Sequence, residues 1–301
     1  MFDILTRAGC FIAIILLGYV LRKVNFFKEG DFVVLSKVTL KITLPCAFIA
    51  NFAGKQIDIS MLFISLLAFG AGVLYIVLGY IINVKNGKEK QAFEVLNLSG
   101  YNIGNFTLPF VQSFLGPVGV ITTSLFDVGN AFICLGGAFG VASSLKGAGG
   151  FSAKRIVQAL SKSVAFLTCI TMVTITLLNI SIPAPIVSFA EIVGGANAFM
   201  AMLMIGVGFK LSGERSQIGS IVKILSLRYG VAILLAFIFY HLPLEHEARV
   251  ALMVLAFSPI ASAVPAFTEE LKGDVGLSSA INSISILCSI VFMVSILLMM
   301  L

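Results

Sequence analysis

Long apolar stretches, separated by short polar connections, run along almost the whole chain. Most of them are about 20 residues or longer, the length that a helix needs to cross a bilayer core of roughly 30 Å. The pattern predicts an all-α integral membrane protein with no soluble domain between its spans. We expect ten membrane-spanning helices, at about 4–22, 31–53, 61–84, 91–114, 119–145, 155–180, 184–210, 217–240, 247–270 and 276–301.

The composition supports this class. Of the 301 residues, 59% are hydrophobic and 11% are charged, and the mean hydropathy is +1.07. These values exclude a soluble globular protein. The net charge of +6 resides in short connections, so it indicates orientation and does not favour a nucleic-acid partner. Two histidines, and five cysteines without CxxC spacing, predict no metal site.

Lysine and arginine are distributed unevenly between the two sets of loops. The even-numbered loops carry little beyond Lys55 and Arg249. Because cytoplasmic loops are enriched in these residues, we expect the odd-numbered loops in the cytoplasm and both termini outside. The odd-numbered loops carry Arg22, Lys23, Lys28, Lys85, Lys88, Lys90, Lys146, Lys154, Arg155, Lys210, Arg215 and Lys272.

The fourth predicted span contains an unusual segment at 96–116. Asparagine amides need hydrogen-bond partners in hydrocarbon, and glycine with proline favours a break in a helix. Non-helical backbone at membrane depth is tolerated where it lines a cavity or is buried in protein. We therefore expect a discontinuous helix that forms a binding site. The residues on which this depends are Asn97, Gly100, Asn102, Gly104, Asn105, Thr107 and Pro109.

A second interrupted segment, 251–271, lies at the corresponding place in the other half of the chain. Its apolar sequence is broken by Ser258, Pro259, Ser262 and Pro265. Paired interrupted segments in two halves are typical of the substrate sites of secondary transporters.

The number of spans predicts how the two halves are related. Residues 1–145 and 155–301 each hold five spans, and a short cytoplasmic linker, 146–154, joins them. An odd number of crossings forces the two halves to run in opposite senses through the membrane. The expected architecture is a 5+5 inverted repeat with broken helices at spans 4 and 9.

Four stretches together resemble the auxin efflux carrier family, which includes plant PIN carriers and bacterial malate or malonate permease-like proteins. Thr107 stands where that family commonly has glycine, so auxin itself is not carried over as the substrate. The four stretches are LSKVTLKITLPCAFIANFA at 35–53, NIGNFTLPFVQSFLG at 102–116, LFDVGNAF at 125–132 and SPIASAVPAFTEEL at 258–271.

This resemblance implies a fold similar to the bile-acid and sodium/proton antiporter superfamily. Spans 4 and 9 would cross as broken helices in a transport domain formed by spans 3–5 and 8–10. Spans 1, 2, 6 and 7 would form a scaffold, and the resemblance suggests a homodimer assembled through that scaffold.

The resemblance also implies an anion site at the crossing. Half-helix N-termini present unpaired N–H groups and positive dipole ends, which hold a carboxylate without a buried cation. Asn102 and Asn105 would supply amide donors. An alternative for Asn102 and Pro109 is polar contact between helices with a tolerated kink. The expected substrate-binding residues are Asn102, Asn105, Thr107, Pro109, Pro259, Ser262, Pro265 and, in the second span, Pro45.

Asp127 is an ionisable residue inside the fifth predicted span, with Asn130 one helical turn further on. An intramembrane charge is a functional hypothesis by default. Two interpretations stay open: Asp127 and Asn130 carry a coupling proton or sodium ion, or Asp127 is a structural acid paired to a neighbour.

These observations predict a secondary active transporter or facilitator in the cytoplasmic (inner) membrane that moves a small organic carboxylate anion by alternating access. The alternative is a non-transporting membrane sensor that binds lipid or another ligand on the same fold. The sequence holds no phosphate-binding loop, HExxH pair or matched acid pair, so no enzyme activity and no cofactor are expected. The expected partners are the anion, membrane lipid, a coupling proton or sodium ion and a second copy of the chain.

Overall fold

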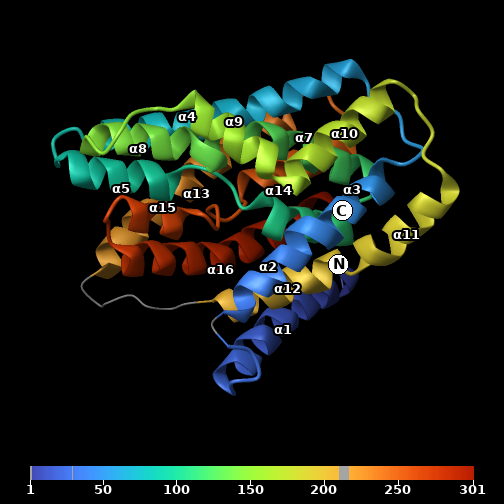
Figure 1. Cartoon of the computed structure of the whole chain (residues 1–301), viewed down its shortest axis with the longest axis horizontal. Helices are drawn as coiled ribbons and strands as arrows, with labels where there is room; N and C mark the ends of the chain where they lie inside the picture. The colour runs from blue at the N-terminus through green and yellow to red at the C-terminus, as the bar shows by residue number, and fades with distance from the viewer. Residues whose placement is uncertain (1, 29, 210–216) are drawn as a thin grey trace.

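The computed structural model describes residues 2–28, 30–209 and 217–301 (Figure 1). Lys210 and Arg215, two of the cations used above for orientation, lie outside the described residues. The first half contains α1 (Phe2–Lys23), α2 (Asp31–Val38), η1 (Thr39–Thr43), α3 (Leu44–Phe52), η2 (Ile59–Leu62), α4 (Phe63–Ile82), α5 (Lys88–Leu98), η3 (Ile103–Thr107), α6 (Leu108–Phe114), α7 (Pro117–Phe132), η4 (Ile133–Gly137) and α8 (Ala138–Lys146).

The second half is helical as well, and η1, η3 and η4 of the first half are π-helical turns. Within the described residues the β-structure is one isolated antiparallel bridge between Tyr101 and Ile260. The second half contains α9 (Ala153–Lys162), α10 (Val164–Leu177), α11 (Ala184–Gly195), α12 (Asn197–Gly208), α13 (Ile218–Tyr240), α14 (His246–Ala256), α15 (Val264–Glu270) and α16 (Val275–Met300).

Seven helical stretches in the described part of the chain are long and apolar enough to cross a membrane. The α9–α10 pair, bent by 79°, would make eight. The expectation of a multi-pass, all-helical membrane protein is thereby confirmed. The seven stretches are Phe2–Lys23, Asp31–Phe52, Ile59–Ile82, Pro117–Lys146, Ala184–Gly208, Ile218–Tyr240 and Val275–Met300.

Two further segments, α5–α6 and α14–α15, each consist of short helices separated by non-helical backbone. The α5 helix ends eleven residues after it starts and is followed by extended backbone at 99–102 before η3 begins. The α14 helix, also of eleven residues, is followed by irregular backbone at 257–263 before the seven-residue α15. Each piece is shorter than the roughly 20 residues of a bilayer crossing. The discontinuity expected in both segments is present.

The prolines are not where these helices break, contrary to the expectation for Pro109 and Pro265. Pro265 is in the first turn of α15, where its missing N–H leaves no intrahelical bond unmade. The backbone departs from the helix earlier, at Ser99, and continues through Gly100, whose φ of +75° favours glycine. Pro109 follows the π-helical turn η3 in a helix that continues through it, and Pro45 follows η1 in the same way.

A shared local sequence explains these two prolines. The π-helical turns η1 and η3 both end at a threonine that is followed by Leu-Pro, at 43–45 and at 107–109. Proline lacks an N–H and clashes with the carbonyl four residues earlier, and a π-helical turn relieves this clash by widening the helix. Pro45 and Pro109 therefore adjust the course of a helix and do not terminate it.

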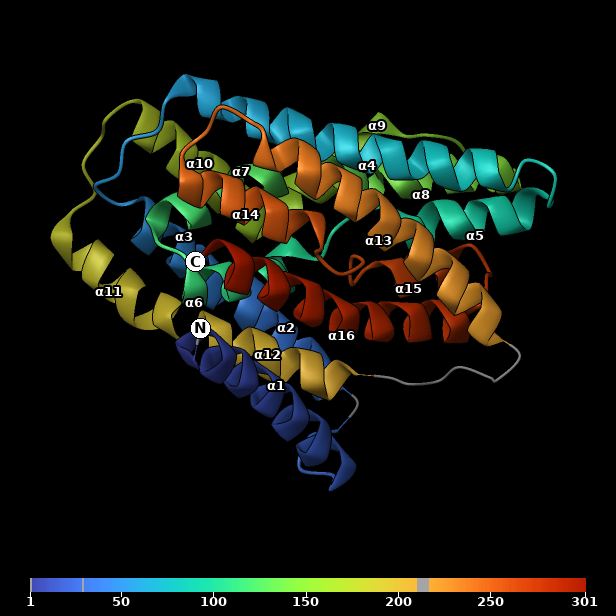
Figure 2. The same cartoon turned by 180° about the vertical axis from the view of Figure 1, so that it is seen from behind.

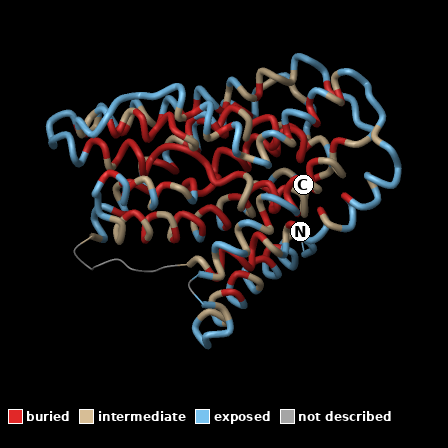
Figure 3. The backbone as a smooth tube through the Cα atoms, viewed as in Figure 1, coloured by how far each residue is buried: buried red, intermediate tan, exposed pale blue. Residues whose placement is uncertain are grey.

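The helices form two groups around the broken segments (Figures 1 and 2). On one side α1 packs along α12, α2 against α12 and α3 against α11. On the other side α4 packs on α5 and α7, and α14 packs on α7, α13 and α16. The backbone tube in Figure 3 shows buried residues concentrated along the central elements, where the two breaks lie. The broken segments thus occupy the centre of the molecule.

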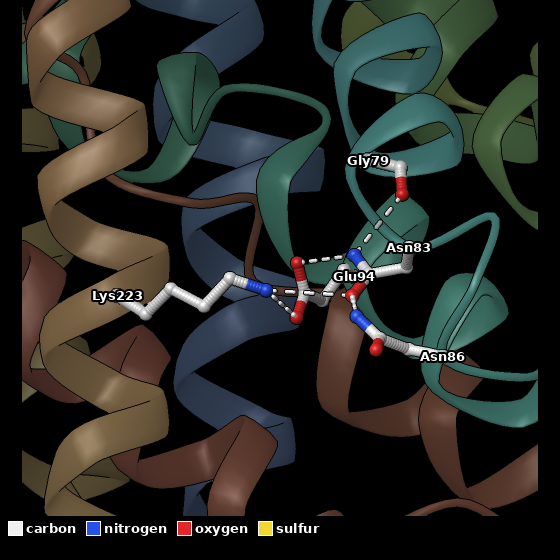
Figure 4. A network of polar contacts seen from close by, with 5 residues as sticks. All are labelled: Gly79, Asn83, Asn86, Glu94 and Lys223. Atoms are coloured by element: carbon white, nitrogen blue, oxygen red, sulfur yellow. Dashed lines mark hydrogen bonds and ion pairs between the residues drawn. The ribbon is translucent and has the colours of Figure 1, made fainter.

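A polar network ties α4, α5 and α13 together (Figure 4). Glu94 of α5 has a side chain only 3% exposed, and its carboxylate lies 2.7 Å from the Lys223 ammonium of α13. The Asn83 amide donates to the other carboxylate oxygen at 2.5 Å and to the carbonyl of Gly79 at 3.3 Å. The Asn83 carbonyl oxygen accepts from Lys223 and from Asn86. The pattern of apolar and polar residues along the chain gives no indication of this network.

Replacing Glu94 by leucine is expected to lower the free energy of unfolding by about 1–3 kcal/mol, because Asn83 and Lys223 lose their acceptor. Adding Lys223→Met should recover part of that loss, since removing both members of a buried pair is often close to neutral. Apparent melting temperatures in detergent measure both effects. Glu270→Ala, which breaks the exposed Arg155–Glu270 pair, is the control and should cost below about 1 kcal/mol. Equal losses of stability in Glu94→Leu and in Glu270→Ala would contradict a stabilising role for the Glu94 network.

Candidate functional site

The two breaks meet and bond to each other directly. The Asn102 N–H donates to the Pro259 carbonyl at 2.9 Å, beside the Tyr101–Ile260 bridge. The Thr107 hydroxyl donates to Ser258 Oγ at 2.8 Å. Thr107 and Ser258 are fully buried, so their bond joins the two breaks inside the protein.

Asn105 and Ser262 form the accessible part of the same crossing. The Asn105 amide donates to Ser262 Oγ at 3.0 Å, across 157 positions of sequence. Neither side chain is buried, in contrast to Thr107 and Ser258. An amide and a hydroxyl from two different breaks therefore face open space at the centre of the molecule.

Two cavities adjoin this pair. The larger, of about 320 Å³, extends from the crossing to the ends of α1 and α12, and α15 and α16 form its opposite wall. The smaller, of about 240 Å³, is bounded by α3, α7 and the start of α10. Asn102, Asn105 and Ser262 line both cavities. The larger volume is within the usual range for a small-molecule site.

The larger cavity offers several groups that bind anions. Arg22 lines it at the end of α1, where its guanidinium donates to the carbonyls of Val207 at 3.0 Å and Phe209 at 3.3 Å. The N-terminus of η3 also borders the crossing, and the first N–H groups of a helix have no acceptor within that helix. These groups and the helix dipole favour negative charge. Glu269 lines the same cavity, so its wall carries both signs of charge.

Asn130 fixes the backbone of the first break. Its side-chain oxygen accepts from the Tyr101 N–H at 2.9 Å, and its amide donates to the Tyr101 carbonyl at 2.9 Å. The same amide donates to the Asp127 carboxylate at 3.0 Å, and the Cys134 thiol donates to the Asn130 oxygen at 3.2 Å. Asn130 is 2% exposed and holds the extended chain as a neighbouring strand would.

Asp127 lies beside the second half of the first broken helix. It lines the smaller cavity, and a β-carbon at Gly104 would lie 3.6 Å from its Oδ2. Within the described residues its carboxylate makes no ion pair, and its hydrogen-bond partner is Asn130. Among the described residues, no cation therefore neutralises this carboxylate.

The structure brings together only part of the expected substrate-binding set. Pro265 lines the larger cavity, and Pro259 contributes its carbonyl to the crossing. Pro45 and Pro109 are buried in their helices and line neither of the two cavities. Their position follows from their local role beside the π-helical turns.

Sequence reasoning missed Arg228, which is the largest fully buried side chain among the described residues. It lies in α13, and its guanidinium donates to carbonyls in both breaks. The signal was present, because Arg228 is a single arginine within a long apolar helix, and such residues usually have a functional partner. Asn282 of α16 was missed as well, and it donates to the carbonyls of Ile260 and Ala261.

Two protein families match the chain in separate regions. Residues 10–149 match the family described as Membrane transport protein, and residues 198–301 match the Sodium Bile acid symporter family. No curated protein matches the sequence. Both matched families are described as transporters, and the two matches together indicate a membrane transporter. The two matches together support a transporter of the auxin efflux carrier type.

Proposed function

We propose that this protein is a secondary transporter, active or facilitative, with ten spans in a 5+5 inverted repeat. The ten spans are the seven continuous stretches, the bent α9–α10 pair, and the two interrupted segments α5–α6 and α14–α15. Residues 1–145 and 155–301 are the two repeats. This proposal is supported by the positions of the two breaks, which lie in the fourth and ninth spans, the corresponding places of an inverted repeat.

The substrate proposed is a small organic carboxylate anion bound at the crossing. The observation that carries this proposal is the Asn105–Ser262 pair, which lines both cavities. Amide and hydroxyl donors, together with the N-terminal N–H groups of η3, suit a carboxylate without a direct cation partner. A site bordered by two separate cavities also fits alternating access, in which one site is reached from each side in turn.

The proposed scaffold and transport domain agree with the positions of these cavities. The larger cavity has α1, α2 and α12 on one side and η3, α15 and α16 on the other. The smaller cavity has α3 and α10 on one side and η3 and α7 on the other. Both cavities therefore lie between spans 1, 2, 6 and 7 and the remaining spans. A sliding motion between these two groups would open one cavity and close the other.

Asp127 is the proposed carrier of a coupling proton, because its carboxylate borders the smaller cavity and lacks a cation partner among the described residues. Asn130 would orient it. The proposal further includes a homodimer through spans 2 and 7, and a location in the cytoplasmic (inner) membrane with both termini outside.

Uptake into proteoliposomes tests the proposed function. Purified protein should move radiolabelled mono- or dicarboxylates, and Asn105→Ala should abolish most of that flux because it removes the accessible amide. Asn51→Ala is the matched control, since its amide bonds within its own helix to Ala47 and lines neither of the two cavities. Saturable binding of an acid without flux would instead support the membrane sensor, and flux of other solutes only would contradict the carboxylate assignment.

A further inference from the structure

Arg228 is the one fully buried arginine of the described chain, with 1% of its surface exposed. It projects from α13 to the point where the two breaks meet. In the described residues no carboxylate lies within ion-pair distance of it. A permanent positive charge is therefore buried at the centre of the molecule without an acidic partner.

Backbone carbonyls from both breaks surround the guanidinium. One terminal nitrogen donates to the Leu98 carbonyl at 2.5 Å, at the end of α5. The other donates to the carbonyls of Gly100 at 2.9 Å, Ser258 at 3.0 Å and Pro259 at 3.2 Å. The Nε donor has no partner among the described residues. One carbonyl ends α5, one follows it and two follow α14, so Arg228 joins the C-terminal ends of both half-helices.

Such an arrangement of carbonyls favours a positive charge. The last carbonyls of a helix lack intrahelical donors and carry the negative end of its dipole. At membrane depth these groups must be satisfied from within the protein. In transporters with discontinuous helices, half-helix C-termini and unwound carbonyls are the usual ligands of a coupling cation. The rings of Tyr75 and Tyr101, at 5.1 and 4.9 Å from the guanidinium carbon, add further attraction for a cation.

We propose that Arg228 is a tethered cation that takes the place of a coupling metal ion at the crossing. The protein then needs no sodium or other alkali cation bound between its half-helices. Because an arginine is not deprotonated in proteins, the charge stays in place throughout the transport cycle. The inference extends the proposed function, since it assigns how the crossing is neutralised in the proposed cycle.

Arg228 acts here through the backbone and does not contact the substrate. It lines neither of the two cavities, whereas Asn102 and Asn105 line both. It is therefore a positioning residue: it holds the C-terminal ends of α5 and α14 together, and so sets where the following N-termini of η3 and α15 face the cavities.

The experiment measures melting temperatures of purified protein in detergent, in sodium, potassium, millimolar guanidinium or choline chloride at matched ionic strength. Wild type should melt at the same temperature in sodium and in choline. Arg228→Ala should melt about 5–10 °C lower in choline, and guanidinium or sodium should raise that temperature in a saturable manner. The melting temperature of Arg228→Lys, which keeps the charge, should lie between those of wild type and Arg228→Ala. A purely structural arginine would show no response to small cations.

Arg249→Ala is the matched control, because Arg249 donates to a single carbonyl, that of Tyr240, away from the crossing. The melting temperature of Arg249→Ala should not depend on which cation is present. Saturable stabilisation of wild type by sodium would overturn the inference, and this measurement requires no variant to fold. An Arg228→Ala protein that folds but gains nothing from any cation would overturn it as well. No carboxylate or flux enters the experiment, so its failure is distinguishable from failure of the proposed function.

Discussion

Asn130→Leu is expected to lower the free energy of unfolding by about 2–6 kcal/mol and to abolish transport. The Asn130 side chain satisfies both the N–H and the carbonyl of Tyr101 in a buried, extended segment. Leucine would leave the Tyr101 N–H without its side-chain partner and the Tyr101 carbonyl with only the Cys134 thiol, 3.6 Å away, and each unsatisfied group costs about 1–3 kcal/mol. The apparent melting temperature in detergent and uptake into vesicles are the measurements.

Two variants calibrate this prediction. Asn130→Asp keeps the acceptor for the Tyr101 N–H, but it loses the donor to the Tyr101 carbonyl and places a second carboxyl group beside Asp127, so it should also destabilise the protein. Asn51→Leu removes a single bond to the Ala47 carbonyl within one helix and should cost below about 1 kcal/mol. An Asn130→Leu protein as stable as wild type would show that the first break is held by other contacts.

Gly129→Ala should destabilise the protein by about 1–3 kcal/mol, although alanine is the better helix former by about 1 kcal/mol. Gly129 of α7 lies against α4, and a β-carbon at this position would overlap the carbonyl oxygen of Ser65. The Ser65 hydroxyl also donates to the Leu125 carbonyl at 2.7 Å, which holds the two helices at this close distance. Relieving the overlap requires α4 and α7 to separate, and this loosens the wall behind the first break.

Gly70→Ala is the control for this substitution. Gly70 lies in α4 itself, and a β-carbon there would meet no atom within 4 Å. The apparent melting temperature of Gly70→Ala should stay the same or rise, because only helix propensity changes. If both glycine variants melt at the same temperature, the close packing of α4 on α7 at Gly129 does not contribute to the stability of the protein.

Local composition was sufficient to predict that two helices are interrupted. Asparagine, glycine and serine inside apolar segments are costly unless the backbone there has partners, so 96–116 and 251–271 stood out. The positions of the breaks were harder to predict. Proline was the visible signal, yet Pro109 lies inside a helix that widens ahead of it, and the chain departs from the helix at Ser99 and Gly100. Which residue adopts extended backbone depends on Asn130, a partner 29 positions from Tyr101.

The polar partners at the centre could not be predicted for the same reason. Arg228 bonds to carbonyls as far as 130 positions away, and Glu94 pairs with Lys223 at a separation of 129. Periodicity and composition describe neighbours along one helix and carry no information on such pairs. Asn130 illustrates the difference: its place beside Asp127 suggested ion coupling, whereas two of its hydrogen bonds hold the backbone of Tyr101.

The central claim is that the crossing binds a carboxylate, and a thermal-shift screen of the purified protein against small mono- and dicarboxylates tests it most directly. A ligand that binds the folded state raises the melting temperature according to its affinity and concentration. The account predicts that at least one acid stabilises wild type and that Asn102→Ala and Asn105→Ala stay folded but lose the shift. If no acid shifts wild type, or if both variants respond as wild type does, the carboxylate site is not at the crossing.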